Sequence, residues 1–475
     1  MPKIKIKKEL LHTPKGTRDI LSDEAKNWEF IETKAKEIAS YYGFRQIRTP
    51  HLEKTELFTP VGEFTDIVEK QMYSFRTRGG DHLSLRPEGT IPIMRSYLQH
   101  GMNALPQPVM LYYSGSFFRH ESPQRGRFRE FGQFGLEMIG EEDAIADAIV
   151  IRVMTLILEE LGLGQFTVHI NTLGDQECRP IYRKELLNYY RRKVNYLCKD
   201  CKKRLKTNPL RLLDCVEEKC IELKKDAPQM IEYACDACRK HFREVFEFLD
   251  KLQIPYFLDH HLVRGLDYYT RTVFEIFYNP PVPLEEPKKA PIINTDLEEE
   301  SVKTFPPQEV PTEEPPPMIV PERAAPLKLA IGSGGRYDQL SGTLSPKKIA
   351  GVGGALGIDR LVEIIIKSKI QIIKETHPKI FLIQLGPQGK QQSLVLLEEF
   401  RKAKMSVASA LAKDSLKNQL RITNNLKVQY ALILGQKEAI DGTIIVRDMA
   451  SGAQETIDQS KLIDYFKKLK KNKKY

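Results

Sequence analysis

Residues 109–140 constrain the fold more than any other stretch, because two alternating segments enclose a short basic one. The alternation in Val109–Arg119 and in Glu130–Ile139 predicts two strands, each with two distinct faces. His120–Arg129 predicts the turn after which the second strand returns. One face of the second strand carries Phe134, Leu136 and Met138, and the other carries Phe131, Gln133, Gly135 and Glu137.

The polar face of this second strand needs an explanation. A face that simply contacts solvent is one possibility. Arg119 ends the first strand, however, and the turn holds three more arginines, Arg125, Arg127 and Arg129. Guanidinium groups bind phosphate oxygens in pairs, so arginines beside a floor of Gln and Glu favour a site for a polyanion and a small polar ligand.

Length and charge set looser limits. A chain of 475 residues is expected to form two or three domains. Its net charge of +10 equals that of the lysines in its two tails, which are Lys3, Lys5, Lys7, Lys8, Lys467, Lys468, Lys470, Lys471, Lys473 and Lys474. Such ends are commonly just solvated, so they permit nucleic-acid binding without establishing it. No apolar run approaches the roughly 18 residues of a membrane span, which predicts a soluble, cytoplasmic protein.

Composition divides the chain into regions. Residues 280–327 hold 13 of the 29 prolines and ten acidic side chains against four basic ones, which predicts a disordered or extended segment. A domain boundary is expected near His377. Beyond it, strands alternate with helices, as in a compact α/β domain.

The segment at about 171–250 is charged, predicted to be helical, and carries all seven cysteines. Cys198 with Cys201, and Cys235 with Cys238, have the paired spacing of a structural zinc site. Cys215 and Cys220 lie between the pairs, and Cys178 is expected to be a lone thiol. Reduced thiols without a metal are an equally good interpretation.

Three motifs resemble those of class II aminoacyl-tRNA synthetases, in the order that the class has them. Gly43–Pro50 resembles motif 1, Phe118–Glu121 with its loop resembles motif 2, and Gly351–Arg360 resembles motif 3. Further strings resemble the histidyl subclass, namely Arg86–Thr90, Leu262–Glu275 and Gly332–Asp338. The last two flank residues 280–327, which marks that segment as an insertion within one domain.

This resemblance implies an α+β catalytic domain on an antiparallel sheet and a C-terminal α/β anticodon-binding domain. The catalytic domain would span residues 1–376, with a helical Cys-rich insertion at about 171–250 and the Pro/Glu-rich insertion at about 280–327. The anticodon-binding domain with its basic tail would span 377–475. The resemblance also implies a homodimer formed through motif 1.

The implied activity is ATP-dependent formation of histidyl-adenylate, followed by transfer of histidine to the 3' end of its tRNA. ATP is expected with Mg²⁺, and the expected partners are histidine, ATP, histidine tRNA and a second copy of the chain. Arg119 and Arg264 would be catalytic, because both would meet the α-phosphate. In this family Arg264 stands where other class II enzymes place a magnesium ion.

The resemblance assigns ligand-binding residues as well. ATP would be bound by Arg119, Glu121, Arg127, Phe131 and Arg360. Histidine would be bound by Glu88, Gly89, Thr90, Arg119, Gln133, Glu137, Arg264, Tyr268 and Tyr269. An alternative is a synthetase-like regulatory subunit of a phosphoribosyltransferase. Such paralogues lack the C-terminal domain and have a degraded arginine string, whereas both features are present here.

Overall fold

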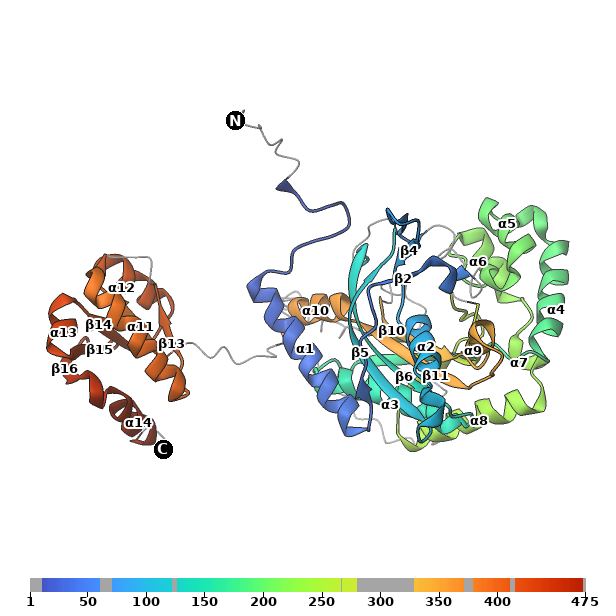
Figure 1. Cartoon of the computed structure of the whole chain (residues 1–475). Helices are drawn as coiled ribbons and strands as arrows, with labels where there is room; N and C mark the ends of the chain where they lie inside the picture. The colour runs from blue at the N-terminus through green and yellow to red at the C-terminus, as the bar shows by residue number, and fades with distance from the viewer. Residues whose placement is uncertain are drawn as a thin grey trace, which may run out of the picture. The chain divides into compact units, whose positions relative to one another are not determined.

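A computed structural model describes residues 11–59, 71–121, 126–265, 267–279, 329–370, 379–410 and 415–472. The chain forms two compact units, residues 1–373 and 374–475 (Figure 1). The proline-rich segment 280–327, the lysines of the N-terminal tail and Arg125 lie outside the described residues. The predictions for those residues therefore stay predictions.

An eight-stranded sheet forms the centre of the first unit, in the order β1-β5-β6-β11-β10-β9-β7-β8. In that order the strands are Arg45–Gln46, Val109–Phe118, Glu130–Ile139, Gly351–Gly357, Leu329–Arg336, Thr270–Tyr278, Phe166–Thr172 and Tyr256–Leu258. Only the outer pairs, β1 with β5 and β7 with β8, are parallel. Strands β5 and β6 pair antiparallel from Val109 opposite Ile139 to Phe118 opposite Glu130, which confirms the predicted pair of strands.

One face of this sheet is filled by apolar side chains. Phe134, Leu136 and Met138 of β6 are buried in a core with residues of four helices. Helices α1 (Ser22–Tyr41), α3 (Ala144–Glu160) and α10 (Ile358–Lys367) pack on this face, and α8 (Asp236–Lys251) packs on α3 (Figure 1). The alternation in β6 therefore separates the face that packs against these helices from the face that carries Gln133 and Glu137.

The opposite face of the sheet carries several small residues, whereas the first face carries large apolar ones. Across β6, β11 and β10, the residues in register on this face include Gly135, Ala355 and Ser333, and next to them Glu137, Gly353 and Gly335. Above this floor lie α2 (Thr90–Gln99), α9 (Leu340–Leu344) and a small antiparallel sheet of β2 (Leu52–Lys54), β4 (His82–Leu85) and β3 (Ser74–Arg76). Neighbouring side chains fill the space above these small residues, since a Cβ atom at Gly135 would lie 2.2 Å from the Tyr113 ring and one at Gly353 would lie 1.8 Å from the carboxylate of Glu137.

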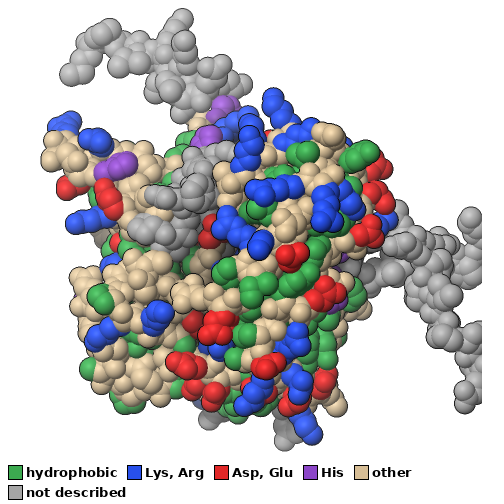
Figure 2. Space-filling view, turned by 90° about the vertical axis from the view of Figure 1, so that its right-hand side faces the viewer, with side chains coloured by type: hydrophobic (Ala, Val, Ile, Leu, Met, Phe, Trp, Pro, Cys, Tyr) green, Lys and Arg blue, Asp and Glu red, His purple; other side chains and the backbone are tan. Residues whose placement is uncertain are grey.

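A helical segment connects β7 to β8, and we call it the helical insertion. It consists of α4 (Arg179–Arg192), η6 (Val194–Tyr196), α5 (Lys199–Thr207), η7 (Pro209–Leu212), α6 (Glu218–Lys225), α7 (Met230–Tyr233) and α8. The predicted helical character of this region is therefore correct. Figure 2 looks onto the side of the molecule where α4 to α7 lie in Figure 1, and lysine and arginine side chains are spread over its upper part.

The second unit is an α/β domain with a five-stranded sheet in the order β13-β12-β14-β15-β16. Its strands are β12 (Ile380–Gln384), β13 (Val407–Ser409), β14 (Tyr430–Leu434), β15 (Thr443–Asp448) and β16 (Gln454–Asp458). Its helices are α11 (Gly386–Lys402), α12 (Leu416–Asn425), α13 (Gln436–Asp441) and α14 (Leu462–Asn472). Short 3-10 turns elsewhere are η2 (Thr55–Leu57), η5 (Met102–Ala104) and η8 (Gln459–Lys461). No helix among the described residues has the length and apolarity that crossing a membrane requires.

Candidate active site

Glu88 stands at the start of helix α2, above the floor of the sheet. Its carboxylate accepts hydrogen bonds from the backbone N–H groups of Thr90 (2.8 Å) and Ile91 (2.7 Å), so it caps the helix. The Tyr268 hydroxyl donates a third hydrogen bond, at 3.2 Å. Burial raises the pKa of Glu88, although these donors and the nearby charge of Arg119 act against the rise.

Glu137 projects from β6 into the same space and is 1% exposed. Its carboxylate accepts hydrogen bonds from the Thr90 hydroxyl (2.7 Å) and from the Tyr337 hydroxyl (2.5 Å). Burial raises the pKa of Glu137 to about 8, although both hydroxyl groups lower it. Gly353 on β11 makes this position possible, because a Cβ atom there would lie 1.8 Å from a carboxylate oxygen of Glu137.

Two arginines lie at the other end of the floor. Arg119 follows β5, and its Nε donates to the carbonyl oxygen of Pro87 at 2.8 Å. Arg264 pairs with Glu275, and its Nη2 donates to the Ser333 hydroxyl at 2.8 Å. Burial lowers the pKa of Arg119, and the positive charge of Arg264 adds to that effect. The two guanidinium groups are therefore close enough for their charges to repel each other.

A further set of charged side chains lies around Glu121. The Glu121 carboxylate lies 3.9 Å from Nη1 of Arg119 and 3.7 Å from Nη1 of Arg127. Arg360, in the first turn of α10, donates from Nε to the carbonyl oxygen of Gly126 at 3.2 Å. Burial lowers the pKa of Arg360, and Arg127 and Arg119 lower it further. The arginines of motif 2 therefore lie close enough to Arg360 of motif 3 to lower its pKa.

Aromatic rings line this region. The guanidinium carbon of Arg119 lies 5.3 Å from the centroid of the Phe131 ring, and that of Arg264 lies 5.7 Å from the centroid of the Tyr269 ring. Cations over aromatic faces at such distances attract the ring quadrupole. Both rings thus help to hold the arginines in place, and the Phe131 ring belongs to the floor of the sheet.

The remaining candidates lie around the same floor. Gln133 is half-buried on β6, opposite Gly115 of β5 and Gly357 of β11, and Gly89 precedes the first residue of α2. Tyr268 reaches Glu88, whereas Tyr269 lies beside Arg264. The structure thus brings the sequence-derived residues together around one face of one sheet.

Sequence analysis missed three residues that shape the site. Tyr337 holds Glu137, and Glu275 and Ser333 hold Arg264. All three lie in the strings Leu262–Glu275 and Gly332–Asp338. Alternation along β9 and β10 was the available signal for Glu275 and Ser333, because these two residues pair directly across the two strands.

A cavity of about 260 Å³ adjoins Arg264 and Tyr269. The helical insertion contributes three arginines to its wall, which are Arg179, Arg183 and Arg211. Burial lowers the pKa of Arg179, while the nearby Asp267 opposes this effect. The space beside Arg264 is therefore bordered by positive charge.

Comparisons with known proteins agree with this geometry. A family model of histidyl-tRNA synthetase matches residues 16–283. The histidine–tRNA ligase of Syntrophotalea carbinolica is 38% identical over 444 residues, which cover 93% of this chain and 95% of that protein. The chain belongs to the histidyl-tRNA synthetase family. A second member, the histidine–tRNA ligase of Dehalococcoides mccartyi, is 38% identical over 460 residues and is covered over its whole length, with 97% of this chain matched.

Solved structures extend the family likeness to the fold. The apo histidyl-tRNA synthetase of S. aureus superimposes with a TM-score of 0.72 at 30% identity, over 96% of this chain and 99% of that one. A structure described as an ATP phosphoribosyltransferase regulatory subunit/histidyl-tRNA synthetase from Bacillus halodurans C has a TM-score of 0.58 at 22% identity, over 90% of this chain and all of that one. It shares the fold alone. Residues 379–469 match the anticodon binding domain, which the regulatory alternative would lack.

The structure contradicts the predicted grouping of Cys198, Cys201, Cys235 and Cys238 as one set of zinc ligands. Cys198 and Cys201 gather with Cys215 and Cys220, and we call this group the four-cysteine cluster. Cys235 and Cys238 gather instead with Cys178 and Asp175, and we call this group the three-cysteine cluster. The pairs were joined on spacing alone, but they begin two different helices, α5 and α8. Cys178 is accordingly not a lone thiol.

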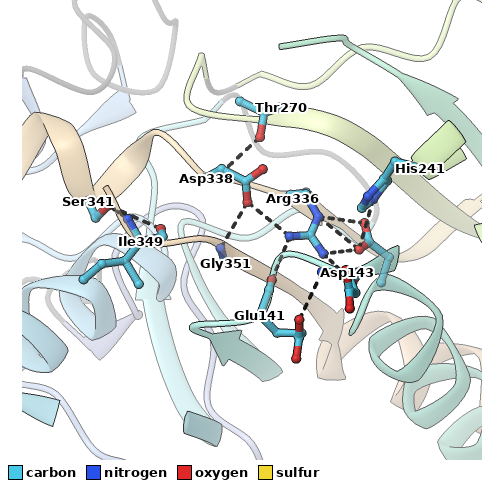
Figure 3. A network of polar contacts seen from close by, with 10 residues as sticks. Glu141, Asp143, His241, Thr270, Arg336, Asp338, Ser341, Ile349 and Gly351 are labelled. Carbon is cyan, nitrogen blue, oxygen red and sulfur yellow. Dashed lines mark hydrogen bonds and ion pairs between the residues drawn. The ribbon is translucent and has the colours of Figure 1, made fainter. Parts of the chain in front are cut away.

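A buried ionic network lies on the packed side of the catalytic sheet of this synthetase. Arg336 of β10 pairs with Asp147 of α3, and both side chains are fully buried. Arg336 also donates to the carbonyl oxygens of Glu141 (2.9 Å) and Asp143 (3.0 Å) and contacts Asp338 at 3.2 Å (Figure 3). Nε2 of His241, on α8, lies 3.4 Å from Asp147. The network ties β10 to the helical insertion.

Proposed function

We propose that this chain is a histidine–tRNA ligase that activates histidine with ATP and transfers it to the 3' end of histidine tRNA. The observation that carries the proposal is the gathering of two cationic groups, Arg119 and Arg264, and two buried carboxylates, Glu88 and Glu137, above one face of the sheet. An anionic ligand fits the first pair and a cationic one the second. A nucleoside triphosphate supplies the anionic group, and the ammonium group of an amino acid supplies the cationic one.

ATP would lie at the end of the floor where motifs 2 and 3 meet. Arg119 and Arg127 would contact phosphate oxygens, because guanidinium groups match their geometry. Phe131 and Arg360 would enclose the adenine, with Glu121 near its amine. Magnesium would arrive with the triphosphate as part of the substrate. The likeness of this region to motifs 2 and 3 supports these roles.

Histidine would occupy the space between α2 and the sheet. Its ammonium group would face Glu88, Gly89 and Thr90, with help from Gln133. Its imidazole would face Glu137 and Tyr269, and Tyr268 would line the same pocket. The burial of Glu137, and the fact that its described hydrogen bonds come from hydroxyl groups, support a role in which a ligand supplies the remaining polar contact.

The activation step needs no general base, since the histidine carboxylate is already an anion. Its oxygen would attack the α-phosphorus, and the bond to the leaving pyrophosphate would break. Arg264 and Arg119 would hold the two anions together and stabilise the charge that develops on the phosphorus oxygens. In the second step, a hydroxyl of the terminal ribose of the tRNA would attack the carbonyl carbon of the adenylate and release AMP.

Exchange of pyrophosphate into ATP that depends on histidine tests the first step. We expect Arg264→Ala to lower the exchange rate by about a hundredfold or more, because one charge-stabilising donor is typically worth that much. Arg243→Ala, an exposed arginine on α8, is the matched control and should leave exchange unchanged. Near-normal exchange by Arg264→Ala would contradict the role of Arg264. Absence of aminoacylation by the unaltered protein would favour the regulatory alternative.

Domain roles, assembly and location complete the proposal. The catalytic domain would be residues 1–376 with its two insertions, and residues 377–475 would contact the anticodon stem of the tRNA. The chain would form a homodimer through motif 1 and act in the cytoplasm. Sedimentation equilibrium tests the dimer directly, because a monomer mass at micromolar concentration would contradict it.

A further inference from the structure

We propose that the helical insertion binds two structural zinc ions, one in the four-cysteine cluster and one in the three-cysteine cluster. The two groups together contain all seven cysteines of the chain. None of these cysteines forms a disulfide. Each cluster offers four ligand atoms that lie within 4.8 Å of one another.

The four-cysteine cluster has the dimensions of a tetrahedral zinc site. Zinc–sulfur bonds of about 2.3 Å place the sulfur atoms of a tetrahedron about 3.8 Å apart. The Sγ atoms of Cys198 and Cys215 are 3.9 Å apart, and all four cysteines are buried. Four sulfur ligands without an open position are typical of structural zinc, not of catalytic zinc.

Backbone donors around this cluster suit thiolates. The N–H of Cys201 donates to Sγ of Cys198 at 3.3 Å, and the N–H of Cys198 donates to Sγ of Cys220 at 3.4 Å. Cys198 stands at the N-terminus of α5, where the helix dipole favours negative charge. Hydrogen bonds of this kind orient the ligands and stabilise the deprotonated sulfur that a metal requires.

A physical need for the metal is visible in the local structure. Helices α5, α6 and α7 have nine, eight and four residues, which is shorter than helices that are stable in isolation. The four-cysteine cluster joins the start of α5 to the loop before α6 and to α6 itself. A metal there would cross-link these three segments, in addition to the apolar core to which Leu197, Leu205 and Leu212 belong.

The three-cysteine cluster is supported by its own geometry. With zinc–oxygen bonds of about 2.0 Å, a carboxylate oxygen and a sulfur in one tetrahedron are about 3.5 Å apart. Oδ2 of Asp175 lies 3.1 Å from Sγ of Cys238 and 3.4 Å from Sγ of Cys235. The Sγ atoms of Cys178 and Cys238 are 3.8 Å apart. This site would fasten the entry of the insertion, before α4, to its exit at α8.

The metal content of the full-length protein is the primary test. The protein is purified from zinc-supplied cells without chelators, and its metals are measured by mass spectrometry. We expect about two zinc ions per chain, since each tetrahedral cluster holds one. No stoichiometric zinc, or iron in its place, would overturn the proposal.

Variants assign each ion to a cluster. Cys201→Ser with Cys220→Ser, and separately Asp175→Ala with Cys238→Ser, should each halve the zinc content. Asp214→Asn is the matched control, because this exposed carboxylate adjoins Cys215 without belonging to either cluster. If one double variant keeps the full zinc content, the site in that cluster is overturned.

A measurement on the unaltered protein guards against variants that fail to fold. A chelator strong enough to remove zinc should lower the midpoint of thermal unfolding, and added zinc should restore it, because metal binding is coupled to folding. An unchanged midpoint after proven loss of the zinc would overturn the structural role. Pyrophosphate exchange is measured separately, so failure of the zinc proposal leaves the proposed ligase activity standing.

Discussion

Arg336, the last residue of β10, and Tyr337, which follows it, hold two buried carboxylates on opposite faces of the sheet. Arg336 pairs with Asp147 on the face covered by α3, and Tyr337 donates to Glu137 on the other face. Burial pushes both pKa values upward. Arg336 overcomes that push and lowers the pKa of Asp147 to about 2, whereas Glu137 has only hydroxyl donors and its pKa rises to about 8.

The difference distinguishes a structural ion pair from a binding group. A carboxylate whose counter-ion belongs to the fold contributes to the rigidity of the protein and has little to offer a ligand. A carboxylate that is equally buried but lacks a cation gains from a ligand that brings donors or positive charge. Glu137 is of the second kind, which is why it belongs to the proposed histidine pocket.

Removal of the charge of Asp147 should have the largest effect on stability. In Asp147→Asn, Arg336 keeps only Asp338 as an acidic partner at 3.2 Å, and its buried charge is left poorly compensated. We expect a loss of about 3–5 kcal/mol in the free energy of unfolding, measured by urea denaturation. Glu398→Gln removes an exposed ion pair and should leave stability unchanged. A similar small effect of Asp147→Asn would refute the contrast.

Removal of the charge of Glu137 should act on ligand binding instead. Glu137→Gln should weaken histidine binding by about 1.5–3 kcal/mol, which corresponds to a KM for histidine raised about ten- to a hundredfold. Its stability should not fall, because no counter-ion is left unpaired. Glu130→Gln, an exposed position on the same strand, is the control. An unchanged KM for histidine would count against the contact.

Stability should depend on pH in opposite ways for the two groups. The folded pKa of Glu137 is raised from 4.5 to about 8, so its contribution is present below pH 4.5 and is lost as pH rises through 8. That of Asp147 is lowered from 3.8 to about 2, so its contribution is present above pH 3.8 and is lost as pH falls through 2.

Between pH 6 and 8 the Glu137 effect should cost about 2 kcal/mol of unfolding free energy in the ligand-free protein. Urea denaturation of the wild type and of Glu137→Gln at both pH values measures it. The variant should lack this part of the decline. If the free energy of unfolding falls equally between pH 6 and 8 in the two proteins, Glu137 titrates normally.

The smallest effect is expected for Tyr337→Phe. The change removes one hydroxyl donor from Glu137 and leaves Arg336 next to it intact. Loss of a single hydrogen bond to a charged group should raise the KM for histidine about tenfold at most, with little change in kcat. Steady-state exchange kinetics measure both. A large fall in kcat with an unchanged KM would assign Tyr337 to a different step.

Much of the site could be predicted from local sequence. Alternation in β6 separates Phe134, Leu136 and Met138 from Gln133 and Glu137, and the structure confirms that the first group is buried in the core. In the second unit, the predicted alternation of strands with helices is confirmed from β12 to β15. The exposed strand β16 departs from it, because it follows β15 directly and its polar run gives too weak a strand pattern.

The cysteines show where local pattern fails. Spacing indicated two pairs, but it could not indicate that Cys215 and Cys220 join the first pair while Asp175 and Cys178 join the second. Each pair occupies the first turn of its own helix, so the helix packing decides which partners it meets. A carboxylate ligand among thiols was also invisible to a search for cysteine spacing.

The sequence by itself determined which residues of β6 face the core, where the motifs lie and which family the chain resembles. Strand alternation and motif spacing are properties of the linear sequence. The tertiary structure alone decided the partners. Glu137 meets Thr90 across 47 positions and Tyr337 across 200, because the strand order places β6, β11 and β10 side by side. Burial and neighbouring charge, which set the different pKa values of Glu137 and Asp147, exist only after that assembly.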